Sequence, residues 1–113
     1  MAKSIGLIVY PVDDLARARA LYQTLLGVEP YVDQPYYVGF RIGEQEIGLD
    51  PQGHKKGLTG PIGYWPVEDI KGSLKSLLEA GAVLHQDVTG VGQGKLIAMV
   101  KDADGNVTGL IQS

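Results

Sequence analysis

The chain has 113 residues, a formal net charge of −3 at pH 7 and no cysteine, and it is 44% hydrophobic and 20% charged. The length predicts one domain with its own core, and the composition argues against disorder. Without a basic excess, nucleic acid is not an expected partner, and the lack of cysteine excludes disulfides, thiolate metal sites and cysteine nucleophiles.

The first half of the chain predicts a strand, a helix and three strands. Residues 5–12 are uncharged and rich in Ile, Val and Tyr, as in a buried strand. Asp13 or Asp14 can cap the next helix, whose apolar side chains recur at helical spacing until Gly27 ends it. Turn residues then separate three strand-like runs, residues 30–32, 36–42 and 45–49.

The second half repeats this order after an aperiodic connector, residues 51–60. A strand over residues 62–67 precedes a helix that Asp69 caps and Gly81 ends. Three further strands are expected over residues 82–85, 95–100 and 107–112, the last after an Asp-Gly-Asn turn. The two openings also correspond, because Tyr-Pro-Val-Asp-Asp-Leu in the first half returns as Trp-Pro-Val-Glu-Asp-Ile in the second. One structural unit is therefore used twice.

The doubled unit resembles the vicinal oxygen chelate superfamily, which contains glyoxalase I, extradiol dioxygenases and bleomycin-resistance proteins. Two stretches carry the resemblance: Val12-Asp-Asp-Leu15 with its helix, and Lys101-Asp-Ala-Asp-Gly-Asn-Val107, where relatives have proline in place of Ala103. The resemblance implies an α+β fold in which two βαβββ modules form a cup-shaped mixed sheet with helices on the outer face. Residues 1–113 would be a single domain, with modules at 4–50 and 61–113 joined by the connector.

Metal-dependent relatives hold their ion with one side chain near the start of each module and a glutamate on each module's last strand. The resemblance places these positions at Leu7, Gly48, Ile62 and Gly109. Aliphatic side chains and glycine supply none of the carboxylate or imidazole ligands that divalent cations need. We therefore predict neither metal nor cofactor, and we expect the two glycines to widen the floor of the cup for an organic ligand.

Strand alternation selects candidate ligand-binding residues, because alternate side chains of a strand share a face. The residues that share a face with Leu7, Gly48 and Ile62 are Val9, Glu46, Asp50 and Tyr64. Tyr10 and Trp65 should instead lie under the helices. For the acids, a solvated strand end is the simpler explanation.

Three further groups extend the candidate site. Tyr36 and Tyr37 suit stacking on a flat ligand, although alternation turns one of them to the other face. His54, in the connector, and Lys95, after a glycine-rich stretch, are candidates for the mouth of the cup. With only two histidines, both outside the four positions, a histidine-based metal site is not expected.

The leading functional hypothesis is a metal-independent protein that sequesters or senses a small organic ligand in an aromatic-lined cup. One alternative is a lyase-, isomerase- or dioxygenase-type enzyme of the same superfamily that uses Glu46, Asp50 or Tyr64 as acid or base. Another is a dimeric interaction module whose cup its own side chains fill. We expect a cytoplasmic protein without a membrane partner, because the chain shows no signal-peptide stretch or membrane-length apolar run. The resemblance to the superfamily, in which dimers are common, implies a homodimer.

Overall fold

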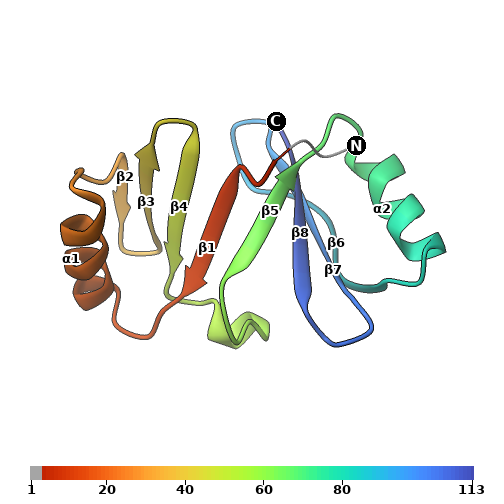
Figure 1. Cartoon of the computed structure of the whole chain (residues 1–113), viewed down its shortest axis with the longest axis horizontal. Helices are drawn as coiled ribbons and strands as arrows, with labels where there is room; N and C mark the ends of the chain where they lie inside the picture. Colours follow the sequence, from red (N-terminus) through yellow and green to blue (C-terminus); the bar gives the residue numbers. More distant parts are fainter. Residues whose placement is uncertain (1–3) are drawn as a thin grey trace. The chain divides into compact units, whose positions relative to one another are not determined.

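The computed structural model describes residues 4–113. Contacts divide the chain into two compact units, which we call the N-terminal module (Gly6–Ile62) and the C-terminal module (Gly63–Ser113, with the segment that ends at Ile5). Each contains a helix and four strands in the order strand, helix and three strands (Figure 1). The predicted α+β fold of two βαβββ units is confirmed. The cup, which needs both modules, stays a prediction.

The N-terminal module is a mixed four-stranded sheet with one α-helix. Its elements are β1 (Leu7–Pro11), α1 (Leu15–Leu26), β2 (Val32–Gln34), β3 (Tyr37–Ile42) and β4 (Gln45–Asp50). The strand order is β2-β3-β4-β1, with β1 parallel to β4 and the other neighbours antiparallel. The helix limits follow the sequence, because the Asp14 carboxylate accepts the Arg17 amide at 3.0 Å and Gly27 ends the helix with a φ of 71°.

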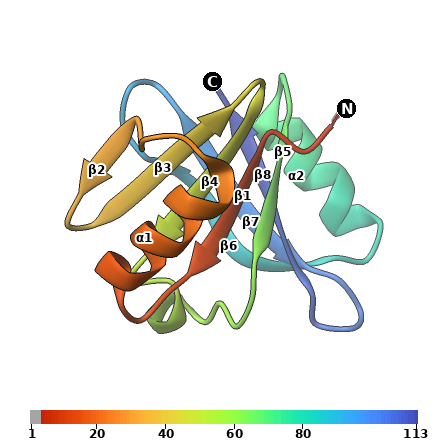
Figure 2. The same ribbon diagram turned by 60° about the vertical axis from the view of Figure 1, so that its left-hand side comes forward.

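One face of this sheet is covered by α1, which packs against β3 and β4 (Figure 2). Phe40, Leu49 and Val38 are almost completely inaccessible there, and each contributes about 1.5–3 kcal/mol through burial. Tyr10 also lies on this side, with its ring centroid 5.0 Å from that of Tyr22. The expectation that Tyr10 lies under the helix is therefore confirmed.

The C-terminal module repeats the plan with β5 (Ile62–Pro66), α2 (Ile70–Glu79), β6 (Val83–Gly90), β7 (Leu96–Lys101) and β8 (Val107–Gln112). The strand order is β5-β8-β7-β6, with β5 parallel to β8. The predicted cap is present, since Asp69 accepts the Gly72 amide at 3.1 Å. Trp65 packs with Ile70 and Leu110 on the helix side, as predicted. Among the described residues, neither helix is long and apolar enough to cross a membrane.

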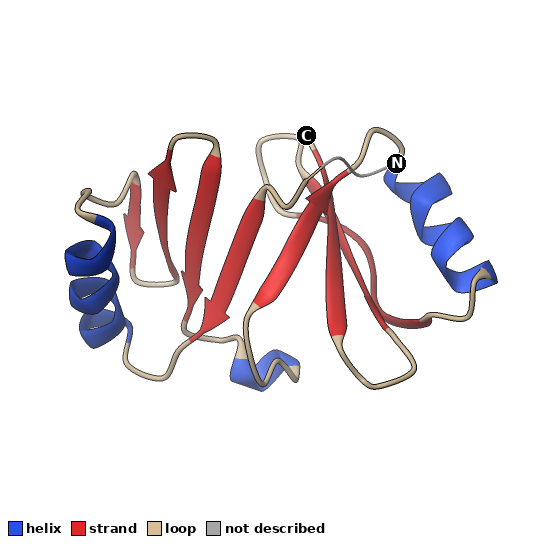
Figure 3. Cartoon of the chain, viewed as in Figure 1, coloured by secondary structure: helices blue, strands red, loops and turns tan. Residues whose placement is uncertain are grey.

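Two expectations about strand limits are wrong. β6 continues to Gly90 instead of ending at His85, because pairing with β7 holds its polar second half despite two register shifts. β2 begins at Val32, where it pairs with β3, and not at position 30. The connector contains a short 3-10 helix, His54–Lys56, visible below the strands in Figure 3. For β2 and β6, pairing with a neighbouring strand outweighs local sequence preference.

Candidate functional site

The face of each sheet opposite its helix, which we call the helix-free face, carries most of the predicted site residues. In the N-terminal module, β1 and β4 pair Leu7 with Glu46, Val9 with Gly48 and Pro11 with Asp50. Their sequence neighbours pack under α1, so alternation turns these six residues away from the helix. In the C-terminal module, Trp65 packs under α2 and Tyr64 points the other way. Within each module the predicted alternation is thus confirmed, and a face shared by the two modules stays a prediction.

Two tyrosines occupy the space above the two glycines. A Cβ on Gly48 would collide with the Tyr37 hydroxyl and lie 2.6 Å from its Cζ atom. A Cβ on Gly109 would lie 2.5–2.9 Å from three ring atoms of Tyr64. The expectation that these glycines widen a cavity is therefore wrong, because each module fills its own gap with an aromatic ring.

These observations also test the fit of the metal that the superfamily resemblance implies. A glutamate at position 48 or 109 would need the space that Tyr37 or Tyr64 occupies. Among residues 4–113, no group of three or more His, Cys, Asp or Glu side chains could hold an ion together. Leu7 and Ile62 add no donor atoms. The chain's residues do not fit the superfamily's metal centre.

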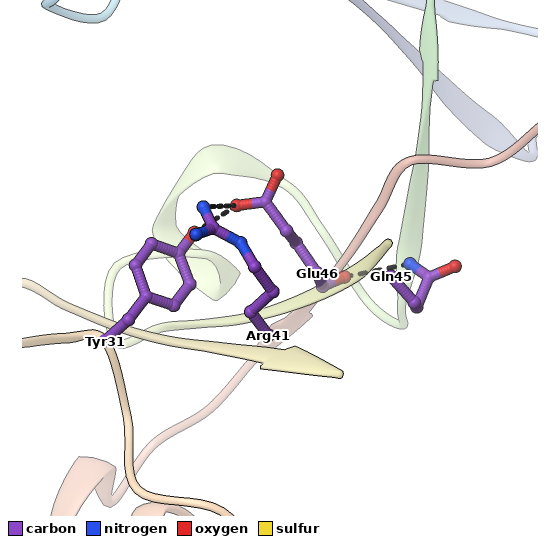
Figure 4. A network of polar contacts seen from close by, with 4 residues as sticks. All are labelled: Tyr31, Arg41, Gln45 and Glu46. Atoms are coloured by element: carbon purple, nitrogen blue, oxygen red, sulfur yellow. Dashed lines mark hydrogen bonds and ion pairs between the residues drawn. The ribbon is translucent and has the colours of Figure 1, made fainter. Parts of the chain in front are cut away.

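A polar cluster of Tyr31, Arg41 and Glu46 lies on the helix-free face of the N-terminal module (Figure 4). The Tyr31 hydroxyl donates a hydrogen bond to Glu46 Oε1, and Arg41 Nη2 lies 3.4 Å from the same oxygen. The Arg41 guanidinium carbon is 4.3 Å from the centroid of the Tyr31 ring, a cation–π arrangement. A cation, a carboxylate and an aromatic ring are thus held together, with Arg41 half exposed.

The protonation of Tyr31 follows from this environment. Burial, followed by the hydrogen bond to the Glu46 carboxylate, raises the pKa of Tyr31 to about 12, while Arg41 opposes that rise. At neutral pH Tyr31 is therefore a hydrogen-bond donor and not a base.

Tyr31 and Arg41 were not among the predicted site residues, although the sequence carried a signal for Arg41. A tight turn at Gly43-Glu44 places Arg41 opposite Glu46 in the β3–β4 hairpin, as observed. Cross-strand partners share a face of the sheet. Once the hairpin register is known, the position of Glu46 therefore predicts that Arg41 lies beside it on the same face. Tyr31 precedes β2 and reaches Glu46 only through the tertiary fold, so no local pattern identifies it.

Asp50 and His54 hold the connector rather than joining the cluster. The largely buried Asp50 carboxylate accepts a hydrogen bond from Lys56 Nζ at 2.8 Å and from the Gln52 amide at 2.8 Å. His54 Nδ1 lies 2.9 Å from Asp13 Oδ1, which links the 3-10 helix to the turn before α1. Both side chains therefore have a structural task in the N-terminal module.

The remaining predicted residues have different surroundings. Tyr36 is 68% exposed in the β2–β3 turn, whereas Tyr37 covers Gly48. Tyr64 is buried, with its hydroxyl 3.9 Å from Met99 Sδ. Lys95 lies in the β6–β7 turn, where its amide donates to the Gly92 carbonyl. Two surface pockets of the C-terminal module are lined by none of the eight predicted residues.

The fold and the sequence together define the class of protein. Residues 4–110 match the model of the Glyoxalase/Bleomycin resistance protein/Dioxygenase superfamily. The chain therefore belongs to that superfamily, as its resemblance to the vicinal oxygen chelate proteins predicted. No match was found among curated proteins.

Solved structures from several bacteria share the fold at low sequence identity. A Legionella pneumophila protein described as an NAD-dependent benzaldehyde dehydrogenase has a TM-score of 0.76 and 16% identity, over 94% of this chain and 96% of its own. A superfamily member from Vibrio splendidus 12B01 has a TM-score of 0.73 and 17% identity, over 95% and 97%. Methylmalonyl-CoA epimerase from Mycobacterium tuberculosis has a TM-score of 0.72 and 17% identity, over 98% and 88%. At such identities the likeness concerns the fold alone.

Proposed function

We propose that this protein binds a small organic ligand without a metal ion, on the helix-free face of its N-terminal module, and sequesters or senses it. The observation that carries the proposal is the pair of tyrosines over Gly48 and Gly109. Both rings fill space that an ion would need. Tyr64 is buried, whereas Tyr37 keeps partly accessible aromatic surface in the N-terminal module, which suits an organic ligand and not a divalent cation.

The Tyr31–Arg41–Glu46 cluster supports a more specific ligand class. Arg41 presents a planar cation that can bind a carboxylate through two hydrogen bonds, and it is already held over the Tyr31 ring. Tyr37 adds an aromatic group on the same face. The expected ligand is a flat organic acid whose ring contacts tyrosine and whose anionic group contacts Arg41. Glu46 would lose part of its contact with Arg41 when the acid binds.

A thermal-shift screen of the purified protein with aromatic acids, thiols, antibiotics and metabolites tests the proposal. A ligand present at about 100 times its dissociation constant should add about 2.7 kcal/mol of stability. That gain should survive a chelator and disappear in Arg41→Ala. Arg17→Ala is the matched control, because Arg17 is a highly exposed arginine on α1.

Two results would contradict the proposal. Stoichiometric metal in the purified protein, with stability lost on chelation, would show that a cation site exists. A ligand whose stabilising effect is the same in Arg41→Ala and in wild type would show that binding occurs elsewhere.

Acid–base catalysis by Glu46 is the second candidate function. Among the three predicted acid–base residues, Asp50 is paired with Lys56 and Tyr64 is buried beside Met99. Glu46 is partly accessible and accepts its hydrogen bond from a tyrosine that keeps its proton. Such a carboxylate suits proton transfer next to a carbonyl group. Incorporation of solvent deuterium into a carbonyl ligand from the screen would favour the enzyme over the binding protein, provided that Glu46→Gln abolishes this incorporation.

We also propose that the protein is a homodimer, which a measurement of its molar mass in solution tests. A dimer whose stability rises with protein concentration in the absence of ligand, together with an empty screen, would favour the interaction module instead.

A further inference from the structure

A second candidate site lies in the C-terminal module, in a groove of about 770 Å³ on the helix side of the sheet. We call it the α2 groove. The residues that line it are Lys71, Leu74, Lys75, Leu78, Glu79, Asp87, Val88 and Leu96. They come from α2, β6 and β7 of one module. The α2 groove is therefore separate from the Tyr31–Arg41–Glu46 cluster.

The interior of the α2 groove is apolar. Leu74 belongs to the core cluster beneath α2, Val88 and Leu96 pack against that cluster, and Leu78 is 38% exposed. A groove of this volume is within the range of small-molecule sites, which bury an apolar body and orient it with a few polar groups. An apolar chain or ring placed there would cover surface that the module itself leaves accessible.

Two lysines provide the positive charge of the groove. Lys71 and Lys75 are exposed and lie one helical turn apart, so both ammonium groups can reach a single anion. Within residues 4–113, neither side chain makes an ion pair or hydrogen bond. Both are therefore available to a ligand.

The two acidic residues of the groove indicate which way an anionic ligand would lie in it. Glu79 is the last residue of α2, where the helix dipole adds to its negative charge, whereas Lys71 lies in the first turn. Asp87 Oδ1 already accepts the Val88 amide at 2.7 Å. The anionic end of a ligand should therefore lie at Lys71 and Lys75. Its apolar body would extend toward Glu79, about 12 Å along the helix axis.

An added peptide strand does not fit the neighbouring sheet edge. β6 is the last strand in the order, but its pairing register with β7 shifts between Gln86 and Thr89. Within that stretch the Thr89 hydroxyl donates a hydrogen bond to the Asp87 carbonyl at 2.8 Å, and the Val88 amide donates one to the Asp87 carboxylate. Local hydrogen bonds thus use backbone groups that an added strand would need. Such an irregular edge resists strand addition. A small molecule is the better occupant.

From these contacts we infer that the α2 groove binds amphipathic carboxylates, with the carboxylate between Lys71 and Lys75 and the apolar chain against Leu74, Val88 and Leu96. Decanoate is a suitable probe because its chain is apolar and its charge is confined to one end. No bond is made or broken, so the site would carry or sense such acids.

Backbone amide NMR during titration with decanoate, kept below its micelle concentration, tests this inference. Saturable shifts should appear on α2, β6 and β7, and not on the β3–β4 hairpin, where the proposed function places its own ligand. Lys71→Ala/Lys75→Ala should weaken decanoate binding about tenfold, since two contacts to a charged group are lost. Lys55→Ala, which removes an exposed lysine of the other module, should leave the affinity unchanged.

Leu78→Gln tests the apolar wall separately from the charges. It keeps the length of an accessible helical side chain while replacing its apolar end, and it should weaken decanoate binding severalfold. The inference is overturned if decanoate gives no saturable shifts, or if shifts fall on the N-terminal module. Unchanged affinity in the double lysine variant would also overturn it, as would equally tight binding of decylammonium.

Discussion

Tyr37 covers Gly48 so closely that a methyl group at position 48 has no room. Tyr64 covers Gly109 in the same way in the other module. Each of the two glycines at an expected metal-ligand position is thus covered by a bulky aromatic residue from the same module. A carboxylate side chain would fit at position 48 or 109 only if the tyrosine that covers that position moved or was replaced.

The first prediction concerns this packing. Gly48→Ala should lower the free energy of unfolding by about 1–3 kcal/mol, because the new Cβ must displace the Tyr37 ring. Chemical denaturation followed by circular dichroism measures the change. Gly60→Ala is the matched control, since a Cβ there meets nothing within 4 Å, and its effect should stay within about 0.5 kcal/mol.

A double variant separates the clash from any general intolerance of alanine at position 48. In a Tyr37→Ala background, Gly48→Ala should cost much less than it does in wild type. An equal cost in both backgrounds would show that Tyr37 does not occupy the space above Gly48.

The second prediction concerns the Tyr31 proton. Its phenol should titrate near pH 12, and Glu46→Gln should move that titration toward the ordinary pKa of 10.0, because the hydrogen bond to a carboxylate is lost. Phenolate absorbance measures this, with Tyr31→Phe identifying the Tyr31 component.

The raised pKa of Tyr31 also sets the sign of a stability change. Between pH 10 and 12 the unfolded chain has released this proton while the folded chain keeps it, so the contribution of Tyr31 is present below pH 10 and is lost as pH rises through 12. Glu46→Gln should make that loss smaller. An identical decline of stability in wild type and in Glu46→Gln would contradict the hydrogen bond between Tyr31 and Glu46.

The third prediction concerns the start of α2. Asp69→Ala should destabilise the protein by about 1 kcal/mol, because the carboxylate that accepts the Gly72 amide is removed. Thermal or urea unfolding measures this. Glu68→Ala, one residue earlier and exposed, removes the same charge without the cap and should have little effect. Equal losses would mean that charge, and not capping, matters here.

The fourth prediction concerns the connector. Lys56→Met should cost about 1 kcal/mol, because the largely buried Asp50 carboxylate loses its ammonium partner and keeps the Gln52 amide. Lys55→Met, its exposed neighbour, should be nearly neutral. Limited proteolysis at residues 51–60 should speed up in the first variant alone, and equal rates would contradict this role for Lys56.

The fold was predictable because its signals are local. Asp14 and Asp69 cap their helices, Gly27 ends α1, and strand alternation correctly separates Tyr10 from Val9. The second half of β6 was missed because its polar residues show no strand periodicity of their own. Antiparallel pairing with β7, the next strand, holds it extended.

The candidate site was predictable only in part. Alternation places Glu46 on the correct face, but it cannot show that Tyr31 and Arg41 meet there. It also cannot distinguish Asp50, which pairs with a connector lysine, from an acid available to a ligand. The partner of a side chain depends on how far apart different segments lie in the folded chain. The spacing of residues within one segment carries no information about that distance.

The sequence by itself determined the superfamily, the doubled strand–helix–strand order and the loss of the usual metal-binding side chains, because residue identity and short-range periodicity encode all three. Only the tertiary structure decided that the glycines are covered and that a tyrosine, an arginine and a glutamate form one cluster. Only it placed an open groove beside α2. These features arise where side chains distant in sequence compete for the same volume, and packing alone decides which of them occupies it.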